Sequence, residues 1–434
     1  MSNMFDIEVF HNPALAPGAT SVDAVITLTA PQDVEGGEEP TAVEIIMVDM
    51  SGSMDQGDRF PMAIEATCAA IEALADGTWF SVIAGTNRAY PVYPARGPAA
   101  IANAETKGEA IKTVRTRLRP SGGTAMGVWI EAATIAVRQM RDTITGPVLA
   151  HGILLTDGKN EHEQRSQLDA RLAAAEGIFQ CDCRGIGADW EVEELRHIAS
   201  RLLGTADIVA SGDLVGEFRS MMGAAMGKRM ADVGLRVWTP KGARIVHLRQ
   251  VAPSIEELTD RGVEPGAPFT LDYPTGAWAG GESRDYHLRV EIPTGEVGQE
   301  RRAARIQLML DQKETEPHFL QAFWTEDTNS TTRIVAEVAH YTGQADLAQA
   351  IDEGLAARKN GDDKTATVRL GQAVKLASES GNDATVRLLQ KVVEVEDAGS
   401  GTVRLKAGVA EEDEMALDVR STRTVRVKRS GEPS

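Results

Sequence analysis

The sequence predicts an α/β domain with a doubly wound, mostly parallel sheet, inserted in an antiparallel β-sandwich and followed by a C-terminal helical bundle. Between residues 43 and 226, apolar runs typical of buried strands alternate with helical patterns, as in a parallel sheet covered on both faces. Residues 5–30 and 231–312 instead alternate apolar and polar side chains, which is typical of antiparallel sheets. Residues 331–397 carry apolar side chains at helical spacing.

The leading strands are expected to belong to the sandwich. Apolar residues alternate from Phe5 to Val9 and again from Val22 to Leu28. A segment this short cannot bury its apolar face by itself, so we predict that it pairs with strands from residues 231–312. The inserted domain must then have both its ends close together.

The inserted domain should contain repeated strand and helix units. Its expected strands are residues 43–49, 79–84, 148–156, 178–187 and 206–210. Its expected helices are residues 60–74, 99–118, 125–140, 164–175, 192–203 and 214–226. Ligands of such folds bind past the carboxyl ends of the strands, so the residues that follow these strands are the first candidates for a site.

Glycines divide the helical part of the chain. Gly361 and the pair Gly381–Asn382 interrupt the apolar helical spacing and predict short loops between antiparallel helices. The full predicted division is 1–40 for the N-terminal strands of the sandwich, 41–228 for the inserted domain, 229–325 for the rest of the sandwich, 326–398 for the helical domain and 399–434 for a flexible charged tail.

Charge and composition exclude several kinds of function. The chain has 64 acidic and 45 basic residues, a net charge of −19, which argues against nucleic-acid binding because that needs a positive surface. The sequence contains no run of about 18 apolar residues, so no membrane span is expected. The first residues lack the basic and apolar regions of a signal peptide. Cys68, Cys181 and Cys183 are expected to be buried thiols. We therefore predict a cytoplasmic protein.

The stretch from Val43 to Ser53 carries the main functional signal. An apolar strand ends in Asp49, and Ser51 and Ser53 follow at alternate positions. These three oxygen-bearing side chains can converge on one hard cation such as Mg²⁺, Mn²⁺ or Ca²⁺. Asp and Ser are also common in turns and at helix N-caps, so this pattern alone is equally compatible with an ordinary turn that binds no ion.

Two later stretches place further oxygen ligands at the same kind of position. Thr124 follows the glycine-rich turn Pro120–Gly123 at the start of a predicted helix, and Asp157 follows the apolar strand 148–156. The order Asp-x-Ser-x-Ser, then Thr, then Asp resembles the metal-ion-dependent adhesion site of the von Willebrand factor A domain. The resemblance covers residues 41–228, and all five positions of the motif are present. The flanking layout looks like bacterial cytosolic proteins of this kind.

The resemblance implies roles for these residues. Ser51 and Ser53 would ligate the cation directly, and Thr124 would do so directly or through water. Asp49 and Asp157 would act mostly through water and hold the hydroxyl groups in place. The ion would be Mg²⁺ or Mn²⁺ rather than Ca²⁺, which usually takes more carboxylates. A partner protein would complete the shell with an Asp or Glu side chain, so the predicted function is that of an intracellular adaptor and not of an enzyme.

A metal-dependent hydrolase or phosphatase-like enzyme is the alternative, because a bound Mg²⁺ can activate water or polarise phosphate. Such an enzyme would also need a general base and a nucleophile or a phosphate clamp. The sequence has no Gly-x-Ser-x-Gly, Walker A or His-Glu-x-x-His motif, and the stretch after Asp49 lacks the second aspartate expected of aspartyl-phosphate phosphatases. His151, at the other end of its strand, is interpreted as a structural residue.

The last residues have a separate feature, an acidic stretch 411–418 followed by a basic stretch 420–429. A disordered, solvated terminus explains this composition. The alternative is a regulated docking peptide, in which Thr422 and Thr424 are flanked by arginines and each has a valine three residues later. Basic flanks suit many protein kinases, and the spacing to valine resembles ligands of forkhead-associated domains, so both threonines are candidate phosphorylation sites.

Overall fold

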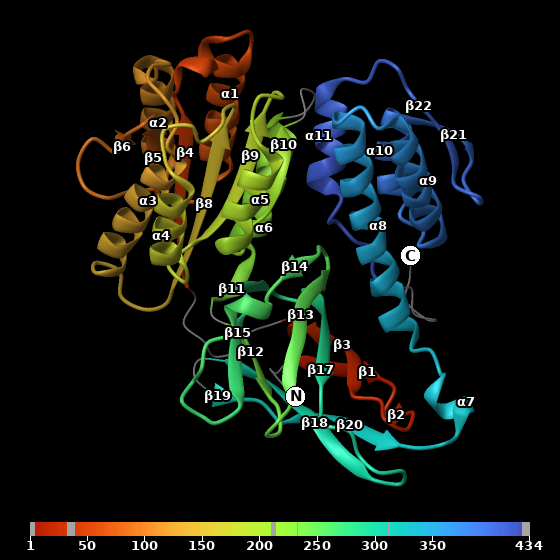
Figure 1. The fold of residues 1–434 in the computed structure, drawn as a ribbon. Helices are drawn as coiled ribbons and strands as arrows, with labels where there is room; N and C mark the ends of the chain where they lie inside the picture. Colours follow the sequence, from red (N-terminus) through yellow and green to blue (C-terminus); the bar gives the residue numbers. More distant parts are fainter. Residues whose placement is uncertain (1–4, 33–39, 210–213, 232, 311–312, 428–434) are drawn as a thin grey trace. The chain divides into compact units, whose positions relative to one another are not determined.

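The computed structural model of the chain describes residues 5–32, 40–209, 214–231, 233–310 and 313–427 (Figure 1). The chain divides into two compact units. The α/β unit comprises Gly36–Ala231 and Gly276–Ala279, and the sandwich–helix unit comprises Met1–Glu35, Asp232–Thr275 and Gly280–Ser434. The α/β unit therefore interrupts the sandwich, as the predicted insertion requires.

The strands of the α/β unit are β4 (Thr41–Asp49), β5 (Trp79–Gly85), β6 (Ala89–Tyr93), β7 (Ala100–Ile101), β8 (Val148–Thr156), β9 (Gln180–Ile186), β10 (Ala206–Val209), β11 (Lys228–Met230) and β16 (Trp278–Ala279). The main sheet has the order β10-β9-β8-β4-β5-β6, with β7 also paired to β5. Its first five strands are parallel, and β6 and β7 run antiparallel to β5. Ile45, Ile46 and Met47 in β4 are fully buried, so both faces of this strand are covered.

The helices of the α/β unit are η1 (Gly52–Asp55), α1 (Arg59–Ala73), α2 (Ala104–Arg117), α3 (Met126–Arg141), α4 (Arg165–Ala175), α5 (Val192–Arg201) and α6 (Leu214–Met226). Helix α1 packs against α2 and α6, whereas α3 packs against α4, which contacts α5. One apolar core joins Ile46 and Val48 of β4 to α1, α2 and α6. The fully buried Trp129 and Ile130 anchor α3. The sheet is doubly wound, which confirms the predicted fold class.

The sandwich has two sheets. In spatial order the first contains β1 (Asp6–His11), β3 (Ser21–Thr29), β17 (Ser283–Glu291), β13 (Arg244–Ala252) and β14 (Glu256–Glu257). The second contains β15 (Thr270–Pro274), β12 (Val233–Trp238), β18 (Glu300–Leu310), β20 (His318–Trp324) and β2 (Ala14–Leu15), with β19 (Lys313–Glu314) paired to β18. Strand β3 pairs antiparallel with β17 over its whole length, with Ala24 opposite Leu288. The leading strands therefore bury their apolar face inside the sandwich.

The C-terminal part contains α7 (Thr328–Thr331), α8 (Ala336–Lys359), α9 (Asp363–Glu379), α10 (Asp383–Val392), β21 (Val393–Asp397), β22 (Thr402–Leu405) and α11 (Glu411–Arg420). The two loops between α8, α9 and α10 contain Gly361 and Gly381, with φ values of +74° and +69°. This left-handed conformation is the usual way to end a helix at glycine. Residues 393–397, predicted to be helical, instead pair with β22 as a hairpin.

The prediction of a flexible tail from residue 399 is wrong as far as residue 427. Helix α11 packs against α8 and α10 because its apolar residues Leu417 and Val419 are buried. Its acidic residues also have basic partners on other helices: Glu414 lies 2.6 Å from Arg358, and Asp413 lies 2.7 Å from Lys391. The charged residues of this segment therefore lie on the outer surface of a folded helix and not in a disordered, solvated chain.

Residues 421–427, here called the strap, lie against the first sheet of the sandwich. The Thr424 hydroxyl donates to Val251 O (2.6 Å), and the Arg426 guanidinium donates to both oxygens of Asp285 (3.0 and 3.1 Å). Tyr341 of α8 donates to the same carboxylate. The strap and the start of α8 thus cover the outer face of this sheet.

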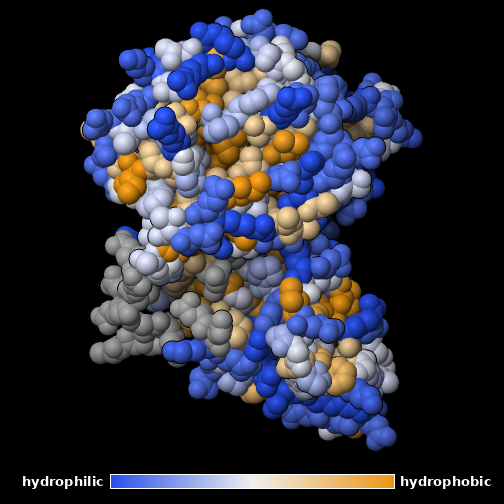
Figure 2. All heavy atoms as spheres, turned by 90° about the vertical axis from the view of Figure 1, so that its left-hand side faces the viewer, coloured by the Kyte–Doolittle hydropathy of each residue, from blue (hydrophilic) through white to orange (hydrophobic). Residues whose placement is uncertain are grey.

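Figure 2 shows one face, on which hydrophilic side chains surround smaller apolar areas. Within the described residues, no helix combines the length and the apolar character that a membrane crossing needs. Cys68, Cys181 and Cys183 are free and buried, which confirms the expectation of buried thiols.

Candidate metal centre

Loops of the α/β unit meet beyond the carboxyl ends of β4 and β8. These strands are parallel neighbours, with Val48 opposite Leu155. Asp49 is the last residue of β4, and Asp157 directly follows β8. The pairing therefore places both aspartates at the same edge of the sheet, where parallel α/β folds bind their ligands.

The loop that precedes α3 is attached to the loop that follows β4. Ser121 N donates to Met50 O (2.6 Å), and Gly52 N donates to Gly122 O (2.9 Å). Gly122 has a φ of +81°, which glycine adopts without strain. These two hydrogen bonds hold the loop before α3, and with it Thr124, next to the end of β4.

Four of the five predicted residues form a continuous chain of hydrogen bonds. Asp49 Oδ1 accepts from Ser51 N (2.7 Å). The hydroxyl oxygens of Ser51 and Ser53 lie 3.0 Å apart, and the Ser53 hydroxyl donates to Asp157 Oδ1 (2.9 Å). Oxygen atoms from two separate loops are therefore already in mutual contact.

The fifth residue, Thr124, reaches the same place across Gly158. A Cβ atom added at Gly158 would lie 3.3 Å from Ser53 Oγ, 3.4 Å from Thr124 Oγ1 and 3.7 Å from Asp49 Oδ2. Side-chain oxygens from three loops thus surround the space that this glycine leaves open. We call the five residues the oxygen cluster: Asp49, Ser51, Ser53, Thr124 and Asp157.

The two carboxylates of the oxygen cluster are fully buried. Burial raises the pKa of Asp49 to about 6, although hydrogen bonds from Ser51 and Thr156 oppose the shift. Burial also raises the pKa of Asp157, in spite of hydrogen bonds from Ser53 and Arg59. The negative charge of Asp157 itself adds to the raised pKa of Asp49. A cation placed among these oxygens would relieve this cost of burying two carboxylates together.

Two residues that support the cluster were not predicted. The Thr156 hydroxyl donates to Asp49 Oδ2 (2.5 Å). Arg59, the first residue of α1, places its guanidinium 3.1 Å from Asp157 Oδ2 and also pairs with Asp189. Thr156 directly precedes Asp157 in the sequence, so its position next to a predicted site residue could have identified it. Arg59 is 98 residues from its partner, and no local pattern connects them.

The loop after Asp157 closes the start of α3. Asn160 Oδ1 accepts from Met126 N (2.8 Å), and Glu163 Oε2 accepts from Gly127 N (2.8 Å). These bonds satisfy N–H groups that the first turn of a helix leaves without partners. The loop therefore fixes the helix that follows Thr124, and it does so from the end of β8.

His162 is a further residue that sequence analysis missed. His162 is exposed. Its ring Nδ1 accepts from Thr124 N (3.2 Å), and its backbone N–H donates to Thr124 O (3.0 Å). A Cβ at Gly123 would clash with the His162 ring at 2.2 Å, so only glycine allows the ring to lie there. An exposed imidazole thus borders the oxygen cluster.

His151 lies at the other end of β8, in a buried ionic network. Its Nδ1 is 2.9 Å from a Glu44 oxygen, and its Nε2 is 3.2 Å from Asp182 Oδ2. The two ring nitrogens face two different carboxylates on neighbouring strands. This arrangement agrees with the interpretation of His151 as a structural residue.

Comparison with known proteins follows the same division of the chain. The profile of the von Willebrand factor type A domain matches residues 44–208, and that of the von Willebrand factor type A C-terminal domain matches residues 375–421. A solved structure described as von Willebrand factor type A from Catenulispora acidiphila is 46% identical, with a TM-score of 0.87, over 98% of this chain and 97% of that one. This chain belongs to the von Willebrand factor type A family. A search of curated proteins finds no match.

Two other solved structures show the fold alone. The ArnB paralog VWA2 from Sulfolobus acidocaldarius is 12% identical, with a TM-score of 0.55, over 97% of this chain and 98% of that one. The human COPII-coat protein Sec24c is 10% identical, with a TM-score of 0.50, over 92% of this chain and 60% of that one. The von Willebrand factor type A domain is a general module for protein interaction and metal binding. The match of the C-terminal domain includes α11, in agreement with its folded state.

Proposed function

We propose that this von Willebrand factor type A protein is a cytoplasmic adaptor that captures an acidic side chain of a partner protein through a divalent ion at the oxygen cluster. The observation that supports the proposal is the convergence of oxygens from three loops at Gly158, beside two buried carboxylates. Arg59 compensates Asp157, whereas the hydrogen bonds to Asp49 come from the uncharged groups Ser51 N and Thr156, and a divalent cation would provide the positive charge there.

The residues present fit a hard divalent ion. The cluster offers three hydroxyl groups and two carboxylates, and oxygen donors are the ligands that Mg²⁺ and Mn²⁺ prefer. Ser51, Ser53 and Thr124 would hold the ion directly, and Asp49 and Asp157 would hold these hydroxyls in position. When bound, the ion supplies an electrophilic position that a partner carboxylate can occupy. Mg²⁺ or Mn²⁺ suits this set better than Ca²⁺, which takes more carboxylates.

The two carboxylates of the oxygen cluster are held in place by hydrogen bonds of the protein itself. Asp49 receives hydrogen bonds on both oxygens, from Ser51 N on one and from Thr156 on the other. Asp157 likewise receives Ser53 on one oxygen and Arg59 on the other. Groups fixed in this way need little rearrangement to bind an ion, which favours affinity and selectivity.

The approach of a partner would occur beside Ser53 and His162. Ser53 is the partly exposed member of the oxygen cluster, and His162 is exposed next to Thr124. An imidazole at the rim can donate a hydrogen bond to an acidic partner. His162 is therefore our candidate for a residue that contacts the partner without touching the ion.

The test combines metal binding with partner capture. We expect the purified protein to bind Mg²⁺ or Mn²⁺ in calorimetry and to capture its partner from native lysate with Mg²⁺ but not with EDTA. Asp49→Ala should reduce both by at least about tenfold while the circular dichroism stays unchanged. Asp55→Ala is the matched control, because Asp55 is an exposed carboxylate in the adjacent η1. Capture that survives both EDTA and Asp49→Ala would contradict the proposal.

An enzymatic role gives a different outcome in the same assays. A metal-dependent hydrolase would turn over a small substrate, such as a phosphate ester, with no partner protein present. Metal-dependent turnover that Asp49→Ala abolishes would replace the adaptor proposal by the hydrolase alternative. No contact in the described part of the chain favours that alternative over capture.

We also propose that the strap is regulated by phosphorylation at Thr422 or Thr424, by a protein kinase, with a forkhead-associated domain as a reader. The Thr424 hydroxyl donates to Val251 O, and a phosphate cannot make that bond. The added charge of about −2 would also compete with Asp285 for Arg426. Phosphorylation would therefore favour release of the strap. Mass spectrometry of protein from its native cell tests this, and finding both threonines unmodified under all conditions would reject it.

A further inference from the structure

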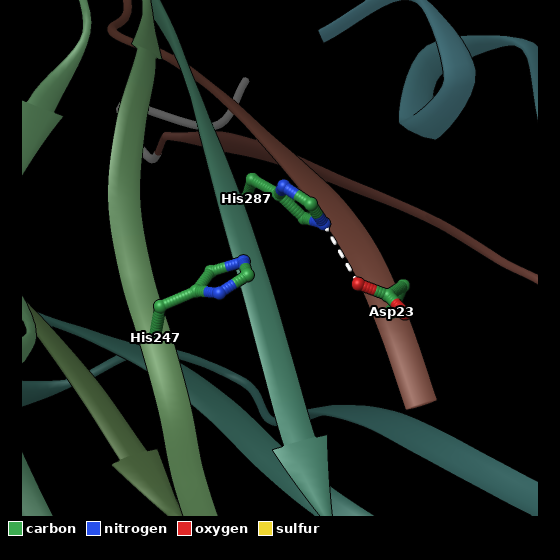
Figure 3. A group of neighbouring side chains, drawn as sticks. All are labelled: Asp23, His247 and His287. Atoms are coloured by element: carbon green, nitrogen blue, oxygen red, sulfur yellow. Dashed lines mark hydrogen bonds and ion pairs between the residues drawn. The ribbon is translucent and has the colours of Figure 1, made fainter. Parts of the chain in front are cut away.

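A second group of metal-ligating side chains lies on the sandwich. Asp23, His287 and His247 belong to β3, β17 and β13, which are adjacent strands in the first sheet. Asp23 and His247 both lie opposite Arg289 of β17, and His287 is two residues from Arg289, so it shares its face. Figure 3 shows the three side chains extending toward one another from the three strands.

The geometry brings three ligand atoms together. They all lie within 4.8 Å of one another, and His287 Nε2 is 2.9 Å from Asp23 Oδ1. The two imidazole rings meet edge to face, with centroids 4.7 Å apart. His247 Nε2 is buried and has no hydrogen-bond partner among the described residues. A buried polar nitrogen without a partner is costly, and here it lies beside two other ligand atoms.

We propose that Asp23, His247 and His287 form a site for Zn²⁺, distinct in chemistry from the oxygen cluster. Imidazole nitrogen suits Zn²⁺ and related transition metals, whereas Mg²⁺ prefers oxygen. Two histidines and one carboxylate supply three of the four ligands of a tetrahedral ion and leave one position open. This second ion would bind to the sandwich and not to the sheet of the α/β unit.

The arrangement needs only side-chain adjustment to accept the ion. With bonds of about 2.1 Å, a tetrahedral Zn²⁺ needs its ligand atoms roughly 3.4 Å apart. His287 Nε2 and Asp23 Oδ1 are already nearer than that, and no pair of ligand atoms needs to close by more than roughly 1.4 Å. His287 would exchange its hydrogen bond to Asp23 for a bond to the metal. All three residues stand on paired strands, although the register of β13 against β17 shifts between Ile245 and His247.

The protonation of His247 is compatible with this role. Burial lowers the pKa of His247 to about 4, and the nearby His287, Arg249 and Arg289 add to the shift. The ring is therefore neutral at pH 7, and a metal binds the neutral form of imidazole.

A purely structural interpretation of the group makes a different prediction. In it, Arg289 is the cation that satisfies Asp23, since its Nε donates to Asp23 Oδ1 (2.7 Å). Removing Arg289 would then destabilise the group. If the group is a metal site, Arg289 competes with the ion, and Arg289→Gln should tighten Zn²⁺ binding by removing a positive charge and freeing the carboxylate.

Another histidine in the chain provides a matched control. His197 pairs with Asp169 through Nε2 (2.7 Å) but belongs to no three-residue ligand group of the described chain. His197→Ala therefore removes a histidine–aspartate pair of the same kind without removing the proposed site.

The experiment measures Zn²⁺ binding to the full chain, with excess Mg²⁺ present to occupy the oxygen cluster. Competition with a chromophoric chelator should give one Zn²⁺ per chain, and Co²⁺ should give the absorption of a four- or five-coordinate site with nitrogen ligands. We expect His247→Ala and Asp23→Ala to weaken binding at least about tenfold, His197→Ala to leave it unchanged, and Arg289→Gln to strengthen it.

Two results would overturn the proposal. One is wild-type protein that binds no Zn²⁺ and gives no Co²⁺ spectrum, a result that needs no variant to fold. The other is Zn²⁺ binding that stays the same in both His247→Ala and His287→Ala. Circular dichroism of each variant shows whether a loss of binding comes from a loss of fold.

Discussion

The two ends of the β4 region bury carboxylates in opposite ways. Near its start, Glu44 shares His151 with Asp182. Burial by itself would lower the pKa of His151, but the two carboxylates outweigh it and raise the pKa to about 9. At the end of the strand, burial raises the pKa of Asp49 to about 6. The first end has the His151 imidazolium between its two carboxylates. At the second end Arg59 pairs with Asp157, but the hydrogen bonds to Asp49 come from the uncharged groups Ser51 N and Thr156.

The comparison shows that burial alone does not identify a binding site. Asp49 is fully buried and Asp182 is half-buried, yet at Asp182 the effect of burial is outweighed by His151 and Arg184, so its pKa is lowered. Asp285, under the strap, has its pKa lowered in the same way, because Arg426, Thr27 and Tyr341 outweigh burial. A lowered pKa marks a carboxylate that the fold itself compensates, whereas a raised pKa marks one for which burial outweighs the compensation, as at Asp49.

The largest effect is expected when the compensated network loses its cation. His151→Ala leaves the buried Glu44 and the half-buried Asp182 without the imidazolium that lies between them. Removing one partner of a buried ionic group costs about 3–5 kcal/mol, and we expect a loss of this size in the free energy of unfolding measured with urea. His197→Ala, which removes a partly exposed pair, should cost less than about 1 kcal/mol. Equal losses in the two variants would contradict the distinction.

The same network predicts a pH dependence of stability. The pKa of His151 is raised from 6.5 to about 9 on folding, so its contribution is fully present below pH 6.5. As the pH rises from 6.5 to 9, the unfolded chain loses the proton while the folded chain keeps it, and stability falls by up to about 3 kcal/mol. Urea unfolding at several pH values measures this fall. It should be missing in His151→Ala, and a fall of the same size in that variant would assign it to other groups.

A smaller loss is expected at the strap. Arg426→Ala leaves Asp285 buried with its bonds to Thr27 and Tyr341 but without its cation. The guanidinium is 39% exposed, so we expect a loss of only about 1–3 kcal/mol. Arg404→Ala is the control, because Arg404 pairs with Glu396 on the surface and should change stability by at most about 0.5 kcal/mol. Increased proteolysis near residues 421–427 would accompany the loss, and resistance equal to wild type would argue against docking by this ion pair.

The sequence predicts the α/β unit well because its signals are local. The apolar runs of β4 and β8 are long and end at polar residues, and the end of β4 with its following loop contributes three members of the oxygen cluster within five residues. The five residues could therefore be chosen before their contacts were known, although metal binding at them stays a prediction. Their supporting partner Arg59 could not, since only the fold brings it to Asp157.

The parts that could not be predicted depend on long-range pairing. The composition of α11 predicts a solvated acidic stretch, but in the structure Leu417 is buried and Glu414 pairs with Arg358. The histidines of the sandwich site are isolated in sequence, and they meet only because β13 and β17 are neighbours. Composition gives the correct answer for a segment when its partners are local, and it fails when distant residues provide the burial and the opposite charges.

The smallest effect on stability, and the sharpest test of the comparison, is expected at Asp49. Asp49→Asn keeps an oxygen that can accept from Ser51 N and removes a buried charge that has no cation of its own. In EDTA we therefore expect the free energy of unfolding to stay within about 1 kcal/mol of wild type.

The difference should appear on adding Mg²⁺. An ion that binds only the folded state stabilises it by about 2.7 kcal/mol at 100 times its dissociation constant, and Asp49→Asn should lose this gain because the ion needs the carboxylate charge. Urea unfolding of both proteins, with EDTA and with Mg²⁺, measures the four values. Asp49→Asn could instead lower the free energy of unfolding in EDTA by roughly 3 kcal/mol or more, the loss expected for a buried ionic network. In that case the negative charge of Asp49 stabilises the fold without any metal ion. The two ends of β4 would then be the same kind of structural network, and the oxygen cluster would lose its main physical argument for a bound cation.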